Sequence, residues 1–212
     1  MSQTTYRKFA QELIDAHYNG KPLPEQPITQ RFVAEWVAML VAKAAVKSAF
    51  GNSNATEVTY ANDQFISTFY NCPLLTDDVT GDKYVVMPAT PAGLPNMREI
   101  AQVSFAGAPN IHVIPMTNHM DFVENGLPPL PGWMVLYKVE NGRIVFKALP
   151  PIINSPVNMK LVGAVPPGAT ILDSVLNIPK DVENDIRSEI LNGLAMNYKV
   201  PPQNLHLAEP TI

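Results

Sequence analysis

The stretch from Gln30 to Phe50 constrains this chain more than any other, because it runs without glycine or proline and is strongly apolar. Thr29 precedes it and can act as a helix N-cap, since a threonine hydroxyl accepts a hydrogen bond from a free backbone N–H of the first turn. Gly51 follows it, and glycine is a common residue at helix ends. The sequence therefore predicts a long helix over residues 30–50.

This helix is apolar on nearly every side. Between Phe32 and Val46 only Glu35 and Lys43 are polar. Such a helix is either buried all round or spans a membrane; this apolar stretch, 32 to 46, is shorter than the roughly 20 residues that a membrane crossing needs. Two alternatives remain, the central helix of a monomeric core and a helix shared with a neighbouring subunit. The candidate oligomer or partner contacts are Phe32, Trp36, Val37, Met39, Leu40 and Val41.

The composition favours assembly. Only 16% of the 212 residues are charged, against about 25% in typical soluble domains. Either loops rich in the 21 prolines cover the surface, or much of it is buried against other subunits. A net charge of −4 gives no basic field for nucleic acid, so no sequence-specific nucleic-acid binding is expected. Cys72 is the single cysteine, which excludes an intrachain disulfide, and the N-terminus lacks a signal-peptide pattern.

Further helices are predicted on both sides of this one. Residues 4–19 form an amphipathic pattern with a threonine cap. A third helix is predicted from the capping pair Asn54 and Glu57 to Phe69, although residues 56–60 alone would fit a strand. Pro179 suits the first position of a C-terminal helix that ends near residue 198. The last ten residues are expected to form an extended tail.

The middle of the chain has the character of β-structure. Strands are predicted at 83–87, 100–105, 111–115, 133–139, 143–148 and 159–165. Asn141-Gly142 between two of them is a strong hairpin signal, because both residues accept positive φ. No helix-length crossovers separate the strands, so an antiparallel unit is expected. The predicted fold is α+β, with helices over 1–73, an antiparallel β region over 74–177, and a C-terminal helix and tail over 178–212.

Catalytic and metal-binding signatures are missing. His112, Met116, His119 and Asp121 lie close in sequence, but no cysteine pair or closely spaced histidine pair accompanies them. The chain contains no phosphate-binding glycine loop and no nucleophile elbow. We therefore expect no enzyme and no cofactor or metal site, although a catalytic site built from residues far apart in the sequence stays open.

Three segments carry a likeness to a known group of proteins. They are Lys83–Pro88 followed by Leu94-Pro95 and Ile100, the hairpin Tyr137–Phe146, and Ile178–Ile186 leading into the C-terminal helix. Together with the N-terminal helices they resemble the head–tail connector, or ring (neck adaptor), proteins of crAss-like short-tailed bacteriophages. The resemblance implies a virion structural protein in the neck or tail region, assembled in the host cytoplasm. It further implies a homo-oligomeric ring, expected to be twelvefold, that contacts the portal protein and tail or other ring proteins.

Two alternatives to the ring subunit remain open. One is a different virion component, such as a capsid-decorating or tail subunit. The other is a carbohydrate-binding β domain with a helical anchor, for which Trp133 is the candidate platform. Ordinary strand packing of Trp133 beside Gly132 competes with that interpretation.

Overall fold

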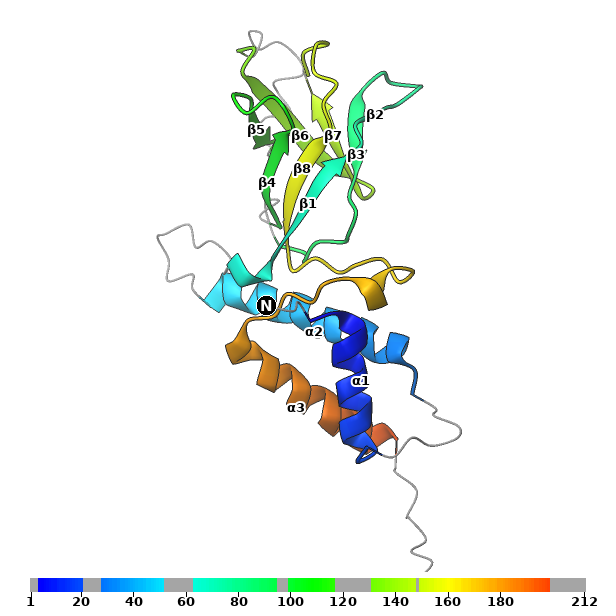
Figure 1. The fold of residues 1–212 in the computed structure, drawn as a ribbon. Coiled ribbons are helices and arrows are strands. Elements are labelled where there is room, and N and C mark those ends of the chain that lie inside the picture. Colours follow the sequence, from blue (N-terminus) through cyan, green and yellow to red (C-terminus); the bar gives the residue numbers. More distant parts are fainter. Residues whose placement is uncertain are drawn as a thin grey trace, which may run out of the picture.

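The computed structural model of the protein describes residues 4–20, 28–51, 63–94, 99–116, 131–147 and 149–198. The described residues form an α+β fold, as the sequence predicts, in which a β unit stands on a layer of helices (Figure 1). The helices are α1 (Tyr6–His17), α2 (Gln30–Gly51) and α3 (Lys180–Asn197). The strands are β1 (Ile66–Cys72), β2 (Leu75–Thr76), β3 (Lys83–Val86), β4 (Ile100–Phe105), β5 (His112–Pro115), β6 (Met134–Glu140), β7 (Arg143–Lys147) and β8 (Val157–Val162).

The three helices begin where their capping residues predict. The Thr5 hydroxyl accepts a hydrogen bond from the backbone N–H of Lys8, and the Thr29 hydroxyl accepts one from Phe32 at 3.2 Å. Pro179, predicted as the first residue of the C-terminal helix, is instead the N-cap residue directly before α3, whose first turn carries acidic residues that interact favourably with the helix dipole. The predictions of the first, second and C-terminal helices are confirmed.

The β unit consists of two sheets packed face to face. One has the strand order β1-β8-β4 and the other β2-β3-β7-β6-β5. Phe105 of the first sheet meets Phe146 of the second with ring centroids 5.0 Å apart. Side chains from both sheets are fully or almost fully buried between them, among them Val85, Phe105, Val135, Ile144, Phe146, Val157, Met159 and Leu161.

The predicted hairpin is confirmed. β6 and β7 pair antiparallel, with Glu140 opposite Arg143. Asn141 has φ 49° and Gly142 has φ 75°, so both turn residues take the left-handed conformation that a tight hairpin requires.

Two sequence predictions need correction. The third helix is wrong at its C-terminal part, because residues 66–72 form strand β1, with Ile66 opposite Val162 of β8. The region assigned to helices, 1–73, therefore contains a strand; the predicted residues 54–62 lie outside the described part of the chain. The β region is also not antiparallel throughout, because β5 pairs with β6 in parallel, His112 opposite Met134.

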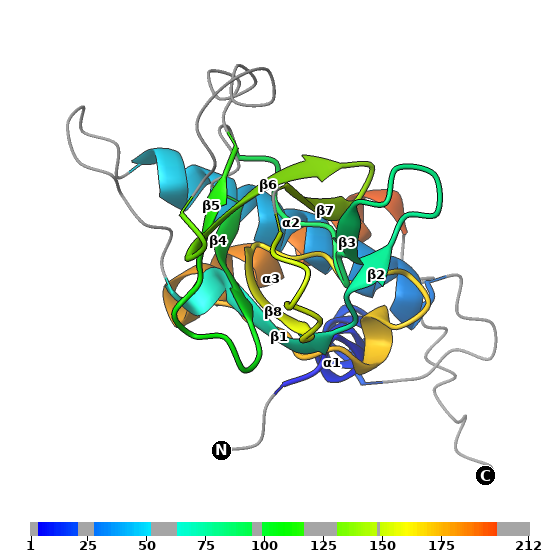
Figure 2. The same cartoon turned by 90° about the horizontal axis from the view of Figure 1, so that it is seen from above.

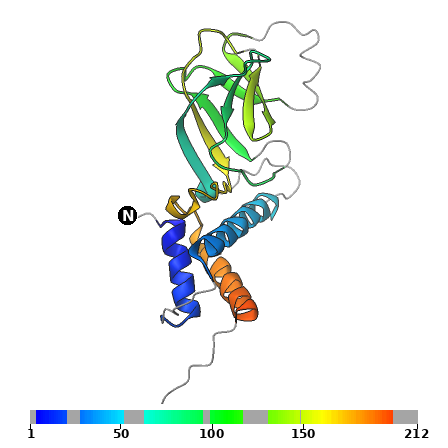
Figure 3. The same ribbon diagram turned by 90° about the vertical axis from the view of Figure 1, so that its right-hand side faces the viewer.

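Helix α2 lies between the β unit and the other two helices (Figures 1 and 3). Toward α1 and α3 it presents apolar side chains that are almost completely buried, including Val33, Ala34, Val37, Ala38 and Val41. The view in Figure 2 looks onto the β unit with the helices behind it. The strongly apolar sequence of α2 thus reflects contacts on two opposite sides.

The contact between α2 and the β unit is made by small residues. A Cβ atom on Gly163, just after β8, would lie 2.8 Å from the Cβ of Ala92 and 2.9 Å from that of Ala45 on α2. The Gly163 N–H donates to the carbonyl of Phe65 at 2.9 Å, and its φ is 55°. Glycine and alanine therefore allow the backbones of the two parts to approach closely.

None of the helices in the described parts of the chain has both the length and the apolar character that crossing a membrane demands.

Candidate interaction surface on the helical layer

A third side of α2 is left uncovered. Phe32 is 43% exposed and Met39 is 61% exposed, while Trp36 between them is half-buried. These residues are spaced four and three apart, so they form one strip along the helix. Within the described part of the chain, Phe32 and Met39 stay largely exposed, and α3 covers only one part of Trp36.

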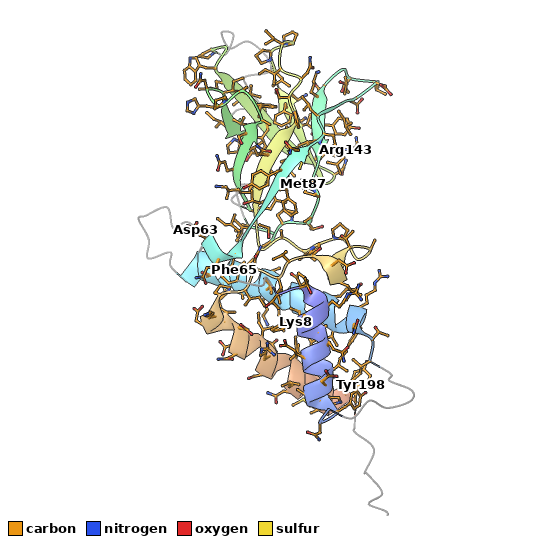
Figure 4. The ribbon with its side chains drawn as sticks, viewed as in Figure 1. Lys8, Asp63, Phe65, Met87, Arg143 and Tyr198 are labelled. Atoms are coloured by element: carbon orange, nitrogen blue, oxygen red, sulfur yellow. The ribbon has the colours of Figure 1, made fainter. Side chains whose placement is uncertain are left out.

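The strip is one wall of a groove that we name the α2–α3 groove. Phe32, Glu35, Trp36 and Met39 of α2 line it together with Asn197 and Tyr198 at the end of α3; Figure 4 labels Tyr198 there. The ring of Phe32 lies 6.0 Å from that of Trp36 and 6.3 Å, edge-on, from that of Tyr198. The groove is open to solvent and has a volume of about 560 Å³.

A glycine in the middle of α3 sets the position of Trp36. A Cβ atom on Gly193 would lie 2.2 Å from the Cη2 atom of the Trp36 indole. Glycine costs about 1 kcal/mol relative to alanine inside a helix, so its place here has a packing reason. The indole lies directly against the backbone of α3, which leaves one part of it covered and the other part facing the groove.

Charged residues surround the apolar strip without entering it. Arg31 and Glu35 form an exposed ion pair at 3.0 Å, and Lys43 lies 3.7 Å from Glu189 of α3. Exposed pairs of this kind contribute at most about 1 kcal/mol. An aromatic and methionine centre inside a charged edge is the composition typical of protein–protein contact surfaces.

The residues predicted as partner contacts fall into two groups. Phe32, Trp36 and Met39 line the groove. Val37, Leu40 and Val41 are at most 8% exposed and belong to the protein's own helical core. This second group is a correction: its burial against the protein's own fold leaves it out of reach of a partner.

Sequence reasoning missed the contribution of α3 to this surface. In the sequence, Tyr198 only marks the end of a helix before two prolines. No local pattern predicts that its ring contacts Phe32. The one available signal was Gly193, because a glycine inside a strongly patterned helix indicates a close approach by another element.

The other candidate residues that the structure describes do not converge on a chemical site. His112 is exposed and contacts Trp133 edge-on at 5.6 Å, whereas Met116 is buried; His119 and Asp121 lie outside the described residues. Where the structure describes the chain, no group of three or more His, Cys, Asp or Glu residues could hold a metal ion. Cys72 is buried, and burial raises the pKa of its thiol.

The acidic turn after β2 has a structural explanation. The Asp77 carboxylate accepts hydrogen bonds from the backbone N–H groups of Val79 and Thr80 at 2.9 and 3.0 Å. These bonds lower the pKa of Asp77. The neighbouring charges on the same face also pair with one another, as in Lys147–Asp82 and Lys138–Glu140, both at 2.7 Å.

A smaller cavity of about 290 Å³ lies where the helical layer meets the β unit. Tyr6, Phe65, Ser67 and Asn177 contribute to its wall, and the Asn177 amide donates to the Ser67 hydroxyl at 3.1 Å. Burial raises the pKa of Tyr6, which keeps its hydroxyl neutral. The cavity therefore offers neutral polar groups and no charge.

Comparison of the chain with models of known protein families and with curated proteins found no match.

Proposed function

We propose that this protein is a virion structural protein, a head–tail adaptor subunit that forms a homomeric ring between the portal and the tail. The observation that carries the proposal is the apolar strip of α2, which the protein's own fold leaves exposed beside Trp36 and Tyr198. The sequence resemblance to phage ring proteins supplies the biological context.

The strip has the properties of a protein contact. Contiguous exposed apolar surface marks interaction sites in soluble proteins, and aromatic residues with methionine are enriched at the centre of interfaces. In a chain with only 16% charged residues, such a strip also favours association. A ring subunit needs heterologous contacts, in which one patch meets a different patch on the next copy.

The mass of the purified protein, alone and with the portal protein of the same phage, tests this function. We expect a discrete oligomer that binds the portal. A stable monomer that joins neither portal nor tail components would refute the adaptor function. Cross-linking in intact particles separates it from a capsid-decorating or tail subunit, because an adaptor links to the portal and a decoration protein links to the shell.

Met39→Glu should weaken this assembly. The side chain is 61% exposed, so the substitution is expected to change the free energy of unfolding by no more than about 0.5 kcal/mol. A charge placed in the apolar strip should nevertheless raise the dissociation constant of the oligomer by at least about tenfold, because an unpaired carboxylate would be desolvated. Native mass spectrometry measures the oligomer distribution.

The matched control for Met39→Glu is Ile152→Glu. Ile152 is 89% exposed on the loop before β8 and lies away from the groove. This variant should keep the oligomer of the unmodified chain. Equal effects of the two substitutions would show that the strip is not a specific contact.

Carbohydrate binding is a second candidate, favoured by the exposure of Trp133. Its side chain is 50% exposed and contacts His112 edge-on. Part of the ring surface therefore stays accessible to a ligand. Exposed tryptophan rings can stack on apolar sugar faces. A glycan array followed by titration of Trp133→Ala is the test: binding that disappears in the variant supports this function, and no binding by the unmodified protein removes it.

A further inference from the structure

The C-terminal end of α3 borders the groove. Tyr198 forms part of the groove wall, and residues 199–212 follow it. We propose that residues 199–212 of a neighbouring copy occupy the α2–α3 groove, so that each subunit gives one tail and receives another. This inference rests on the proposed self-assembly and specifies its contact.

The sequence of the tail fits an apolar groove. Its charged residues are Lys199 and Glu209, whereas Leu205 and Leu207 stand two apart. In an extended segment such residues point to the same side, about 6.6 Å from each other at 3.3 Å per residue. In such an extended segment His206, between them, would point to the opposite side.

The dimensions of the groove match this pair of leucines. Phe32 and Met39 are seven residues apart on α2, which corresponds to about 10 Å along the helix axis. Two leucine side chains about 6.6 Å apart fit within that length. Glu35 and Asn197 at the groove provide polar groups for the backbone of an extended segment.

The adjacent prolines Pro201 and Pro202 favour a neighbour's groove over the groove of the same chain. Val200 and Pro201 each precede a proline, which restricts both to extended conformations. We therefore expect residues 199–202 to resist a tight reversal, which leaves only Gln203 and Asn204 for a turn before Leu205. A return along the same path would also find no N–H donors on the prolines.

Exchange of tails produces a heterologous contact. The donating tail and the accepting groove are different surfaces, and such contacts generate rings when the rotation between subunits closes. A tail of 14 residues (199 to 212) reaches up to about 46 Å when extended. That reach exceeds the length of α3, about 27 Å for its 18 residues.

Site-specific cross-linking tests the occupant directly. Met39→p-benzoylphenylalanine places a photoreactive group in the groove of the full-length chain. Chains carrying it are labelled with ¹⁵N and assembled with unlabelled, unmodified chains before irradiation. We expect cross-links from position 39 of the labelled chain to residues 199–212 of the unlabelled chain. Cross-links within one chain only, cross-links to other segments, or no cross-link between chains would overturn the proposal.

Substitutions in the tail provide the matched comparison. Leu205→Asp combined with Leu207→Asp removes both apolar anchors and should raise the dissociation constant of the oligomer at least tenfold. His206→Asp, between them, should leave it within about twofold, because the proposed extended docking would turn position 206 away from the groove. Equal effects of the two changes, or none from the double change, would contradict tail docking.

The outcomes separate this inference from the proposed function. An oligomer that binds the portal but shows no cross-link to residues 199–212 of a neighbour refutes the exchange of that segment and leaves the adaptor function intact. Exchange of residues 199–212 between subunits that bind neither the portal nor phage-tail components supports this inference and refutes the adaptor function.

Discussion

The β unit and the helical layer bury their apolar residues in different ways. In the β unit two sheets cover one another, and the large exposed apolar side chains stand apart on strands and turns; they include Tyr70, Val79, Val86, Trp133 and Ile152. In the helical layer Phe32 and Met39 stay exposed side by side with Trp36 on a single helix. The β unit is thus self-contained, whereas the helical layer presents a continuous surface.

Geometry explains the difference. A strand alternates its side chains between two faces, so one opposing sheet is enough to cover the apolar face. A helix that is apolar nearly all round needs partners on every side. Helix α2 has the β unit on one side and α1 and α3 on another, whereas the described part of the chain leaves Phe32 and Met39 largely exposed. What remains uncovered is where we expect assembly.

The largest loss of stability is expected from Phe146→Ala in the β unit. Phe146 is 1% exposed and contacts Phe105 between the sheets, so its removal should lower the free energy of unfolding by about 3–5 kcal/mol. Val79→Ala, at a 93% exposed position, should change it by less than about 0.5 kcal/mol. Urea denaturation measures both. Similar values for the two variants would show that the sheets do not form the tight core described above.

Gly163→Ala should have the next largest effect, because it affects the boundary between the two regions. The left-handed backbone costs about 1–2 kcal/mol for a residue with a Cβ, and overpacking against Ala45 and Ala92 costs about 1–3 kcal/mol more. Gly81→Ala is the control: its φ is 73°, with no atom near the added Cβ, so only the backbone cost should appear. Equal losses would mean that the contact with α2 is not tight.

Gly193→Ala should have the smallest effect, and its sign is informative. Helix propensity alone would stabilise the variant by about 1 kcal/mol, whereas displacement of Trp36 should cost about 1–3 kcal/mol. We expect a net destabilisation of about 1 kcal/mol. In a Trp36→Ala background the same change should stabilise by about 1 kcal/mol, and thermal unfolding of the four chains completes the cycle. Stabilisation in both backgrounds would remove the proposed packing of Trp36 on α3.

Local signals explain which parts of the fold the sequence could predict. The helix caps at Thr5 and Thr29 and the Asn141-Gly142 turn depend on neighbouring residues, and each is found where expected. Strand β1 depends on β8, with Ile66 paired to Val162 far along the chain. Phe65 and Phe69 are four apart and therefore fit a helical face as well. The pairing that decides between strand and helix is not visible locally.

The same limit applies to the candidate surface. The sequence predicts contacts with a partner along α2, yet Met39 and Val37 are equally apolar and only their neighbours distinguish them. Val37 is covered by the helical core, while Met39 is open. That distinction depends on where the other helices cross α2. The periodicity of apolar residues within α2 does not predict those crossing points.

The hydrogen bond between Gly163 and Phe65 has a consequence for how such a protein can change over generations. The chain leaves the helical layer at Phe65 and returns at Gly163, two residues joined by a backbone hydrogen bond of 2.9 Å. Everything between them is topologically an insertion whose ends are adjacent, and domains with adjacent ends are readily inserted or exchanged. The β unit can therefore diversify, or be replaced by another domain, while the helices keep their order and packing.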